Sequence, residues 1–129
     1  MKILILFIIL FLHIVADFNL QGILANMKQK KWWAEQTTDE SYKNDYIVAL
    51  LIHGFSWSFM VHLPIIVMII LYSKYGCVTG LALSLLAQAV LHAIVDHNKA
   101  NLHLFNLIED QLLHLSQIII IWVITILMP

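Results

Sequence analysis

The sequence predicts an all-α fold: an integral membrane bundle of four transmembrane helices, with an interfacial loop or a short amphipathic helix between the first and the second. Hydrophobic residues make up 61% of the 129 residues and charged residues only 12%, whereas a soluble domain averages about 25% charged residues. The apolar residues fall into four runs, each of which meets or approaches the roughly 20 residues that a membrane-spanning helix needs. The length permits one small bundle, so we expect residues 1–129 to form a single transmembrane helical domain.

The first predicted span covers about residues 2–20. Its start could be a signal peptide, because Lys2 precedes an apolar run. No good small-residue cleavage site follows, however, and the run continues into His13 and Asp17, which match polar pairs later in the chain. We therefore expect the segment to be retained as a membrane helix.

The longest polar region, residues 21–45, separates the first span from the second. It combines lysines with Trp32 and Trp33 and carries acidic residues toward its end. Lysine beside tryptophan suits the headgroup layer of a bilayer. We expect this segment to anchor the chain at the interface, and recognition of a lipid headgroup is the alternative.

The other three spans cover about residues 46–72, 77–96 and 107–128. The second of the four spans is long, and Pro64 inside it predicts a kink whose freed carbonyl can be satisfied by neighbouring helices. The stretch 73–76 is short, so the second and third spans should form an antiparallel hairpin.

The lysines are distributed unevenly between the two ends of this predicted bundle. The connections after the first and third spans, residues 21–45 and 98–106, contain Lys28, Lys30, Lys31, Lys43 and Lys99. The opposite end contains Lys2 and Lys74. The positive-inside rule places those two connections in the cytoplasm and both termini outside, although Lys2 and the amino terminus oppose that orientation.

Three of the predicted helices carry a histidine and an aspartate four residues apart. The pairs are His13/Asp17, His92/Asp96 and, in reversed order, Asp110/His114. Four residues is about one helical turn, so each pair lies on one face of its helix. The fourth helix runs opposite to the first and third, so all three pairs place the aspartate outermost and the histidine one turn deeper. Ionisable groups at membrane depth are costly, which indicates a functional site.

The second predicted helix adds His53, about 10 Å inside its start at the helical rise per residue. We therefore expect four histidines in one layer and three aspartates one turn above it, with Ala49 at the carboxylate level of the second helix. His62 lies deeper and on the opposite face, so we expect an interhelical hydrogen bond there and exclude it from the site. His97 and His103 fall in the third connection and are expected to be solvated.

Further polar residues extend the same helix faces. They are Gln21, Lys99, Glu109 and Gln111. Lys99 follows Asp96 by three residues, and we expect the two to form an interfacial ion pair.

Imidazole and carboxylate groups together favour a divalent metal site, with zinc as the first choice and iron or manganese as alternatives. The single cysteine, Cys77, excludes an internal disulfide and a cysteine metal cluster. The predicted ligands are His13, Asp17, His53, His92, Asp96, Asp110 and His114. They suffice for one metal with a ring of orienting residues, or for two metals. The alternative is a metal-free polar seam of His–Asp hydrogen bonds that holds the helices together.

The three aspartates Asp17, Asp96 and Asp110 are also the candidate catalytic residues. A bound metal makes hydroxide available for hydrolysis, and a neighbouring carboxylate can carry the proton. The sequence contains neither the His-Glu-x-x-His zinc-protease motif nor the Gly-x-Ser-x-Gly elbow. The leading hypothesis is hydrolysis of a lipid-linked or phosphorylated amphiphile, because the site lies near the interface and beside the Lys/Trp segment.

Two other classes of function remain open at this stage. A proton- or metal-coupled small transporter would use similar residues, but the outer halves of the helices, such as residues 65–71 and 118–127, are nearly all apolar. A non-catalytic membrane subunit would use the seam only for structure. The lipid bilayer is the expected partner, and a homo-oligomer stays open; the net charge of −1 gives no indication of nucleic-acid binding.

The motifs together resemble a known family over nearly the whole chain. They are His13-x3-Asp17-Phe18-x2-Gln21, Lys28, Leu51-Ile52-His53, His92-x3-Asp96-x2-Lys99 and Asp110-Gln111-x2-His114. In this order they resemble the small bacterial membrane proteins grouped as domain of unknown function 3307; the combination is specific, whereas any one motif alone is weak. The resemblance implies a multi-pass protein of the bacterial cytoplasmic (inner) membrane with a site at these residues, and implies no particular reaction. A looser similarity to inner-membrane metal-dependent hydrolases, which also place histidine and aspartate in membrane helices, is an analogy that does not establish function.

Overall fold

The computed structural model describes residues 2–72 and 75–127 and confirms the all-α membrane bundle. Its long helices are α1 (Lys2–Ile14), extended by a π-helical turn η1 (Val15–Asn19), then α4 (Asp45–Leu71), α5 (Val78–Ala100) and α6 (Leu107–Leu127). All four are long and apolar enough to cross a membrane, so the chain is a multi-pass membrane protein by length and composition.

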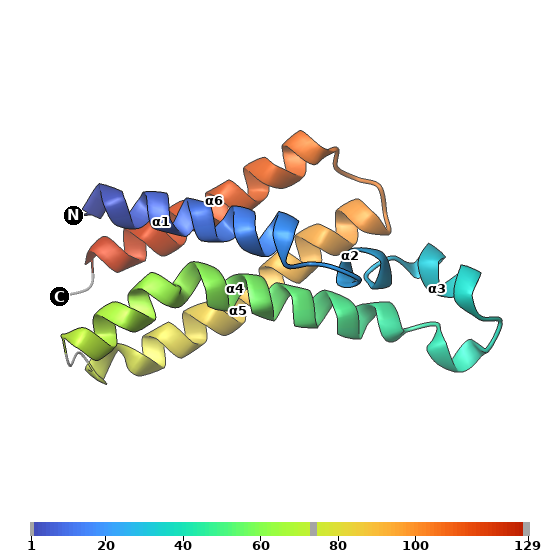
Figure 1. Ribbon diagram of the computed structural model, residues 1–129, viewed down its shortest axis with the longest axis horizontal. Helices are drawn as coiled ribbons and strands as arrows, with labels where there is room; N and C mark the ends of the chain where they lie inside the picture. The colour runs from blue at the N-terminus through green and yellow to red at the C-terminus, as the bar shows by residue number, and fades with distance from the viewer. Residues whose placement is uncertain (1, 73–74, 128–129) are drawn as a thin grey trace.

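The helices run antiparallel in sequence order, so α1 begins and α6 ends at the same end of the bundle (Figure 1). A hydrogen bond joins these two ends, because Trp122 Nε1 donates to the Lys2 carbonyl oxygen at 2.9 Å. The segment between α1 and α4 and the connection between α5 and α6 lie at the opposite end (Figure 1). This arrangement agrees with the predicted topology. Two residues of the predicted short turn, Ser73 and Lys74, lie outside the described residues, as does Met128.

Helix α5 continues to Ala100, so the prediction that the connection begins at residue 98 was wrong. The apolar run ends earlier, but a helix can continue on polar residues where they find partners. His97 shows this: it is half-buried in the last turns of α5 and stacks on Tyr46 of α4 at 5.8 Å between ring centroids. The prediction of a solvated His97 was therefore wrong, whereas His103 is exposed as predicted.

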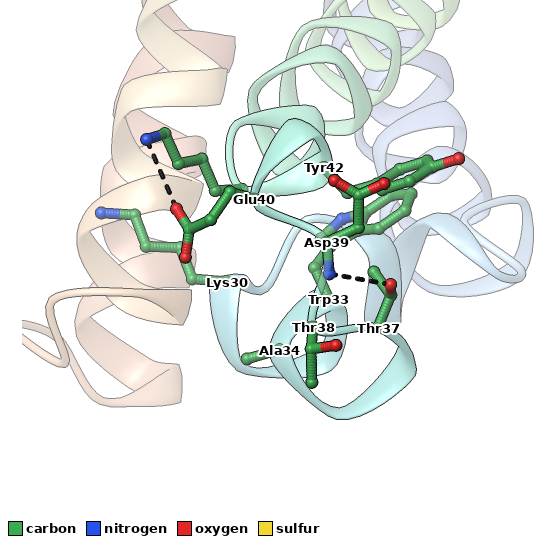
Figure 2. A pocket seen from close by; sticks show the side chains of 9 residues that line it. Lys30, Trp33, Ala34, Thr37, Thr38, Asp39, Glu40 and Tyr42 are labelled. Carbon is green, nitrogen blue, oxygen red and sulfur yellow. Dashed lines mark hydrogen bonds and ion pairs between the residues drawn. The ribbon is translucent and has the colours of Figure 1, made fainter.

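The segment between α1 and α4 contains two short helices, α2 (Leu24–Met27) and α3 (Lys30–Gln36), and a 3-10 turn, η2 (Glu40–Tyr42). Trp33 is held by a hydrogen bond from its Nε1 to the Met27 carbonyl oxygen at 2.7 Å. An open cavity of about 450 Å³ lies between α3 and η2, with Trp33, Thr37 and Tyr42 in its wall (Figure 2). At its edge the backbone N–H of Ser41 donates to the Asp39 carboxylate at 2.9 Å, which lowers the pKa of that carboxyl.

Helices α4 and α5 approach each other closely at Gly54. A methyl group at this position would lie 2.5 Å from the Ala89 carbonyl oxygen, so only glycine permits the contact. The close approach brings His53, the neighbour of Gly54, toward α5. Further along, α4 remains helical through Pro64, and its ribbon changes direction about midway (Figure 1), as expected for a proline inside a helix.

The interior of the bundle divides into an apolar part and a polar part. The apolar core is formed by Ile9, Ala16, Trp57, Val61, Ile65, Ile69, Ile118 and Ile121. The buried histidines and aspartates, except His62, gather toward the end where α2 lies. Large apolar side chains cover the outer surface of the four helices, which fits a lipid environment.

Candidate metal site

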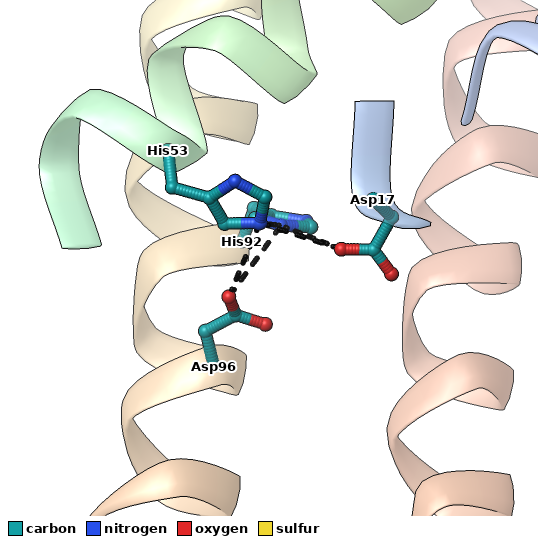
Figure 3. Close-up of side chains that lie close together, drawn as sticks. All are labelled: Asp17, His53, His92 and Asp96. Atoms are coloured by element: carbon teal, nitrogen blue, oxygen red, sulfur yellow. Dashed lines mark hydrogen bonds and ion pairs between the residues drawn. The ribbon is translucent and has the colours of Figure 1, made fainter. Parts of the chain in front are cut away.

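Four buried side chains from three elements converge between the helices and form the first group: Asp17 of η1, His53 of α4, and His92 and Asp96 of α5 (Figure 3). One ligand atom of each residue lies within 4.8 Å of the others. All four residues are at most 4% exposed. The described part of the chain therefore contains a buried His/Asp group that could hold a metal ion.

Three of the five distances within the first group are close to those expected around one metal ion. His53 Nε2 lies 3.2 Å from His92 Nε2, 3.3 Å from Asp17 Oδ1 and 3.4 Å from Asp96 Oδ2. His92 Nε2 lies 3.8 and 3.9 Å from the same two oxygens. Ligand atoms on a tetrahedral ion with bonds of about 2.0–2.1 Å are about 3.4 Å apart. Most of these distances are longer than a good N–H···O hydrogen bond, which rarely exceeds about 3.2 Å.

A second group consists of Asp96, Asp110 and His114, and it shares Asp96 with the first. His114 Nε2 lies 3.4 Å from both Asp96 Oδ1 and Asp110 Oδ1. The two oxygens of Asp96 therefore face different groups: Oδ2 faces His53 and His92, and Oδ1 faces His114. A carboxylate in this position can bridge two metal ions.

The hydrogen bonds of His114 indicate what its Nε2 atom can do. Its Nδ1 donates to Gln117 Oε1 at 3.2 Å, so in the neutral ring the lone pair is on Nε2. Among the residues that the structure describes, neither His114 Nε2 nor Asp110 Oδ1 has a hydrogen-bond partner, although both are buried. When the ring is neutral, three electron-pair donors converge there, and either a cation or a proton on His114 Nε2 would satisfy them.

His13 lies beside the two groups and belongs to neither of them. Its Nδ1 accepts a hydrogen bond from Trp57 Nε1 at 2.8 Å, and its Nε2 donates to Gln111 Oε1 at 3.1 Å. Both ring nitrogens are therefore engaged. The structure brings together six of the seven predicted ligands and places His13 as a neighbour that contacts them through Gln111; the ligand roles themselves stay predictions.

The π-helical turn η1 explains why His13 and Asp17 have different surroundings. The Leu20 N–H reaches back to the Val15 carbonyl at 2.9 Å, five residues earlier, so the turn is wider than an α-helical one. Asp17 is thereby rotated relative to the position that α-helical spacing predicts. π-Helical turns occur frequently at functional sites.

Gln111 connects the two groups. Its amide nitrogen donates to Asp17 Oδ2 at 3.0 Å and to Asp110 Oδ2 at 3.1 Å. Since its amide oxygen accepts from His13, every polar atom of the side chain has a partner. Sequence reasoning treated Gln111 only as a neighbour of Asp110.

Aromatic stacking orients the histidine rings. Trp57 stacks on His92 with 4.2 Å between ring centroids, and His92 stacks on His114 at 4.1 Å. Sequence reasoning missed Trp57 and Gln117. Helical spacing contained a signal for both, because Trp57 follows His53 by four residues and Gln117 follows His114 by three.

Two lysines contact the carboxylates of the site. Lys28 Nζ lies 2.6 Å from Asp96 Oδ2, and Lys99 Nζ lies 2.6 Å from Asp110 Oδ2. The predicted ion pair between Lys99 and Asp96 was therefore wrong. The Lys99 side chain pairs with Asp110 on α6 instead, and Asp96 pairs with Lys28, which follows α2.

The remaining polar residues lie outside both groups. Glu109 is exposed and accepts from the Asn106 N–H at 2.9 Å, and Gln21 is half-buried. His62 is buried on the α4–α5 interface, where its Nε2 lies 3.0 Å from Ser84 Oγ and its Nδ1 donates to the Ser58 carbonyl oxygen at 2.8 Å. The prediction of a hydrogen-bonded interhelical His62 is confirmed.

The fold and the site together define a multi-pass membrane protein with a buried His/Asp centre able to hold a metal ion. The chain matches no protein-family model, no curated protein and no solved structure.

Proposed function

We propose that this protein is a metal-dependent membrane hydrolase that cleaves a lipid-linked or phosphorylated amphiphile. The observation that carries the proposal is the position of Asp96, whose two oxygens face two adjacent groups of histidine and aspartate atoms. Paired metal ions about 3.5–4 Å apart are characteristic of phosphatases, nucleases and aminopeptidases. Zinc suits the two nitrogen and two oxygen ligands of the first group best, and iron or manganese is the alternative.

A bound divalent ion supplies two things: it activates a water molecule, and it polarises the bond under attack. In the proposed reaction the water oxygen adds to the phosphorus or carbonyl carbon, the bond to the leaving oxygen breaks, and a proton of the water reaches that oxygen. Asp17, Asp96 and Asp110 are the candidates for binding the ion and carrying the proton. Asp110 is the best placed proton carrier, because its Oδ1 has no hydrogen-bond partner among the described residues.

The depth of the site supports an amphiphilic substrate. His53 is eight residues inside α4, which begins at Asp45, and this corresponds to about 12 Å. A lipid whose headgroup lies at the membrane surface could reach this depth while its chains stay in the bilayer. The lysine distribution supports a site near the cytoplasmic face, and the resemblance to domain of unknown function 3307 supports a bacterial inner membrane; both remain predictions.

A transport function has weaker support. Beyond the site the core includes the apolar residues Val61, Ile65, Ile118 and Ile121. The buried polar side chains Ser58, His62 and Thr125 also lie there, but each is hydrogen-bonded to a helix carbonyl oxygen, which argues against a continuous polar path to the other face.

Metal content and hydrolysis of the purified protein test the proposal. We expect the wild type in detergent, supplied with zinc, to retain metal in mass-spectrometric analysis, and His92→Ala to lose most of it. His103→Ala is the matched control, because His103 is exposed in a loop outside both groups. Absence of metal from the wild type would refute the metal site.

Release of phosphate from phosphatidic acid in mixed micelles, or of fatty acid from phosphatidylcholine, tests the reaction. A protein that binds metal and hydrolyses neither substrate would refute the hydrolase while leaving the metal site intact. If the protein binds no metal and its host tolerates His92→Ala and His114→Ala, the protein is instead a non-catalytic membrane subunit whose His–Asp hydrogen bonds only hold the helices together.

A further inference from the structure

Two ammonium groups contact the carboxylates of the centre, and the two lysines come from different parts of the chain. Lys28 lies after α2, between the first two spans, and Lys99 lies in the last turn of α5. Their Nζ atoms are each 2.6 Å from a carboxylate oxygen, of Asp96 and of Asp110 respectively. The Lys28 side chain is 13% exposed and that of Lys99 is 35% exposed. Both therefore lie at the boundary between the buried groups and the surroundings.

Lys28 contacts the same Asp96 oxygen that a metal ion in the first group would bind, so its role is not explained by the ion pair with Asp96 alone. Asp96 Oδ2 is the atom that faces His53 and His92, so an ion in the first group would bind the same oxygen that Lys28 contacts. The ion and the ammonium group carry the same sign, and their repulsion at this range is strong in a buried site. Metal binding would therefore weaken the ion pair between Asp96 and Lys28, and it would favour the binding of an anion beside the Lys28 ammonium group.

The charge of the centre indicates how much negative charge that anion needs. The buried carboxylates Asp17, Asp96 and Asp110 carry three negative charges and the two lysines carry two positive ones, while metal-binding histidines are neutral. One negative charge is left over. One divalent ion changes this to one positive charge, and two ions change it to three. Uncompensated charge is costly at membrane depth.

A phosphoryl group supplies the missing charge and a carboxylic ester does not. A phosphate monoester carries about −1.5 to −2 charges at pH 7 and has three strong acceptor oxygens. Lysine is a common point-charge partner for phosphate. A neutral ester or amide would leave both the ions and the lysines uncompensated.

We infer that Lys28 and Lys99 bind the phosphoryl group of the substrate on either side of the metal centre and so restrict the enzyme to phosphorylated amphiphiles. This inference rests on the proposed hydrolase function and assigns its substrate class. Lys28 exchanges Asp96 for the phosphoryl oxygens once metal is bound, and Lys99 approaches them from α5.

Binding of inorganic phosphate to the zinc-loaded protein tests this role without relying on turnover. The variants are Lys28→Met and Lys99→Met, which keep an apolar side chain of similar length and remove the charge. Lys31→Met is the matched control, because the Lys31 side chain is 85% exposed and forms an ion pair with Glu35, at 3.7 Å, outside both groups. Calorimetric titration gives the affinity for zinc and then, on the loaded protein, for phosphate.

We expect each site variant to weaken phosphate binding by about tenfold or more, the usual effect of losing a hydrogen bond to a charged group. Zinc should still bind, and to Lys28→Met at least as tightly as to the wild type, since a competitor for Asp96 is gone. Lys31→Met should match the wild type in both titrations. If Lys28→Met does not fold, Lys28→Gln can still donate to Asp96 without the charge, and the same criterion applies to it.

Four results would overturn the inference. Equal phosphate affinity in the wild type and both site variants would show that the lysines do not bind the anion. Loss of zinc from these variants would show that the lysines maintain the ligand set instead. A zinc-loaded wild type that binds no phosphate would also refute the inference, whereas a wild type that binds no zinc would refute the proposed function as well.

Discussion

The substitution Gly54→Ala tests whether the close approach of α4 and α5 creates the site. Gly54 adjoins His53, and the Ala89 carbonyl oxygen lies opposite it on α5. An added methyl group would lie 2.5 Å from that oxygen, whereas ordinary contact begins at 3.4 Å. The neighbouring atom is backbone and cannot rotate away, so the helices must separate.

The required separation follows from these two distances and is about 0.9 Å. The same separation would lengthen the distance between His53 Nε2 and His92 Nε2 from 3.2 Å to about 4.1 Å. Two nitrogens on opposite sides of a zinc ion are roughly 4.2 Å apart, so the two rings could then bind one ion only in a nearly linear arrangement. Tetrahedral binding by both rings is then lost. Overpacking of this kind also destabilises a protein by about 1–3 kcal/mol.

Gly80→Ala is the matched control, because nothing lies within 4 Å of a methyl group at Gly80 in α5. Alanine is a better helix former than glycine by about 1 kcal/mol, so this variant should be as stable as the wild type or more so. We expect Gly54→Ala to melt roughly 5 °C or more below it in detergent and to bind zinc at least about tenfold more weakly. Equal melting temperatures and equal zinc affinities for the two variants would refute the geometric argument.

Three further predictions concern the roles of single residues. Asp96→Asn should lower the metal content of both groups together, measured as zinc per protein by mass spectrometry; loss from one group alone would contradict a bridging role. Trp57→Phe, which removes the hydrogen bond to His13 and keeps the stacking, should weaken zinc binding by less than about tenfold in titration, because His13 reaches the candidate ligands through Gln111; a loss of tenfold or more would show that His13 binds the ion directly. His62→Ala should lower the melting temperature through loss of packing and of the contact to Ser84, but leave zinc affinity unchanged; a change in zinc affinity would place His62 in the site.

The fold could be predicted from the sequence because membrane spans are defined by length and hydropathy, which are local properties. The grouping of the aspartates with most of the histidines could be predicted for a related reason. When the direction of each antiparallel helix is known, the depth of each residue follows from its position along the helix. Because α6 runs opposite to α5, the reversed order of Asp110 and His114 brings them to the level of Asp96 and His92. Depth along a helix depends only on the rise per residue.

Rotation about the helix axis and the reach of long side chains could not be predicted in this way. His13 lies outside both groups because the π-helical turn at Val15–Asn19 changes the angle per residue, and no pattern in the sequence indicated that turn. Lys28 and Lys99 have flexible side chains several ångströms long, so their partners depend on which helix lies across from them. Sequence spacing paired Lys99 with Asp96, whereas the tertiary structure pairs it with Asp110.

The hydrogen bonds of the three carboxylates can be compared with those expected in a metal centre and in a polar seam. Each aspartate has one oxygen that accepts a short bond from Lys28, Lys99 or Gln111, at 2.6–3.0 Å. The other oxygens of Asp96 and Asp110, and Asp17 Oδ1, lie 3.3 Å or more from the histidine nitrogens that they face. Charge-assisted hydrogen bonds in a polar seam are usually about 2.7–2.9 Å long. The contacts between these oxygens and the histidine nitrogens are 3.3–3.4 Å long instead, close to the spacing of ligands around a tetrahedral ion. They therefore fit a site that could hold a metal ion.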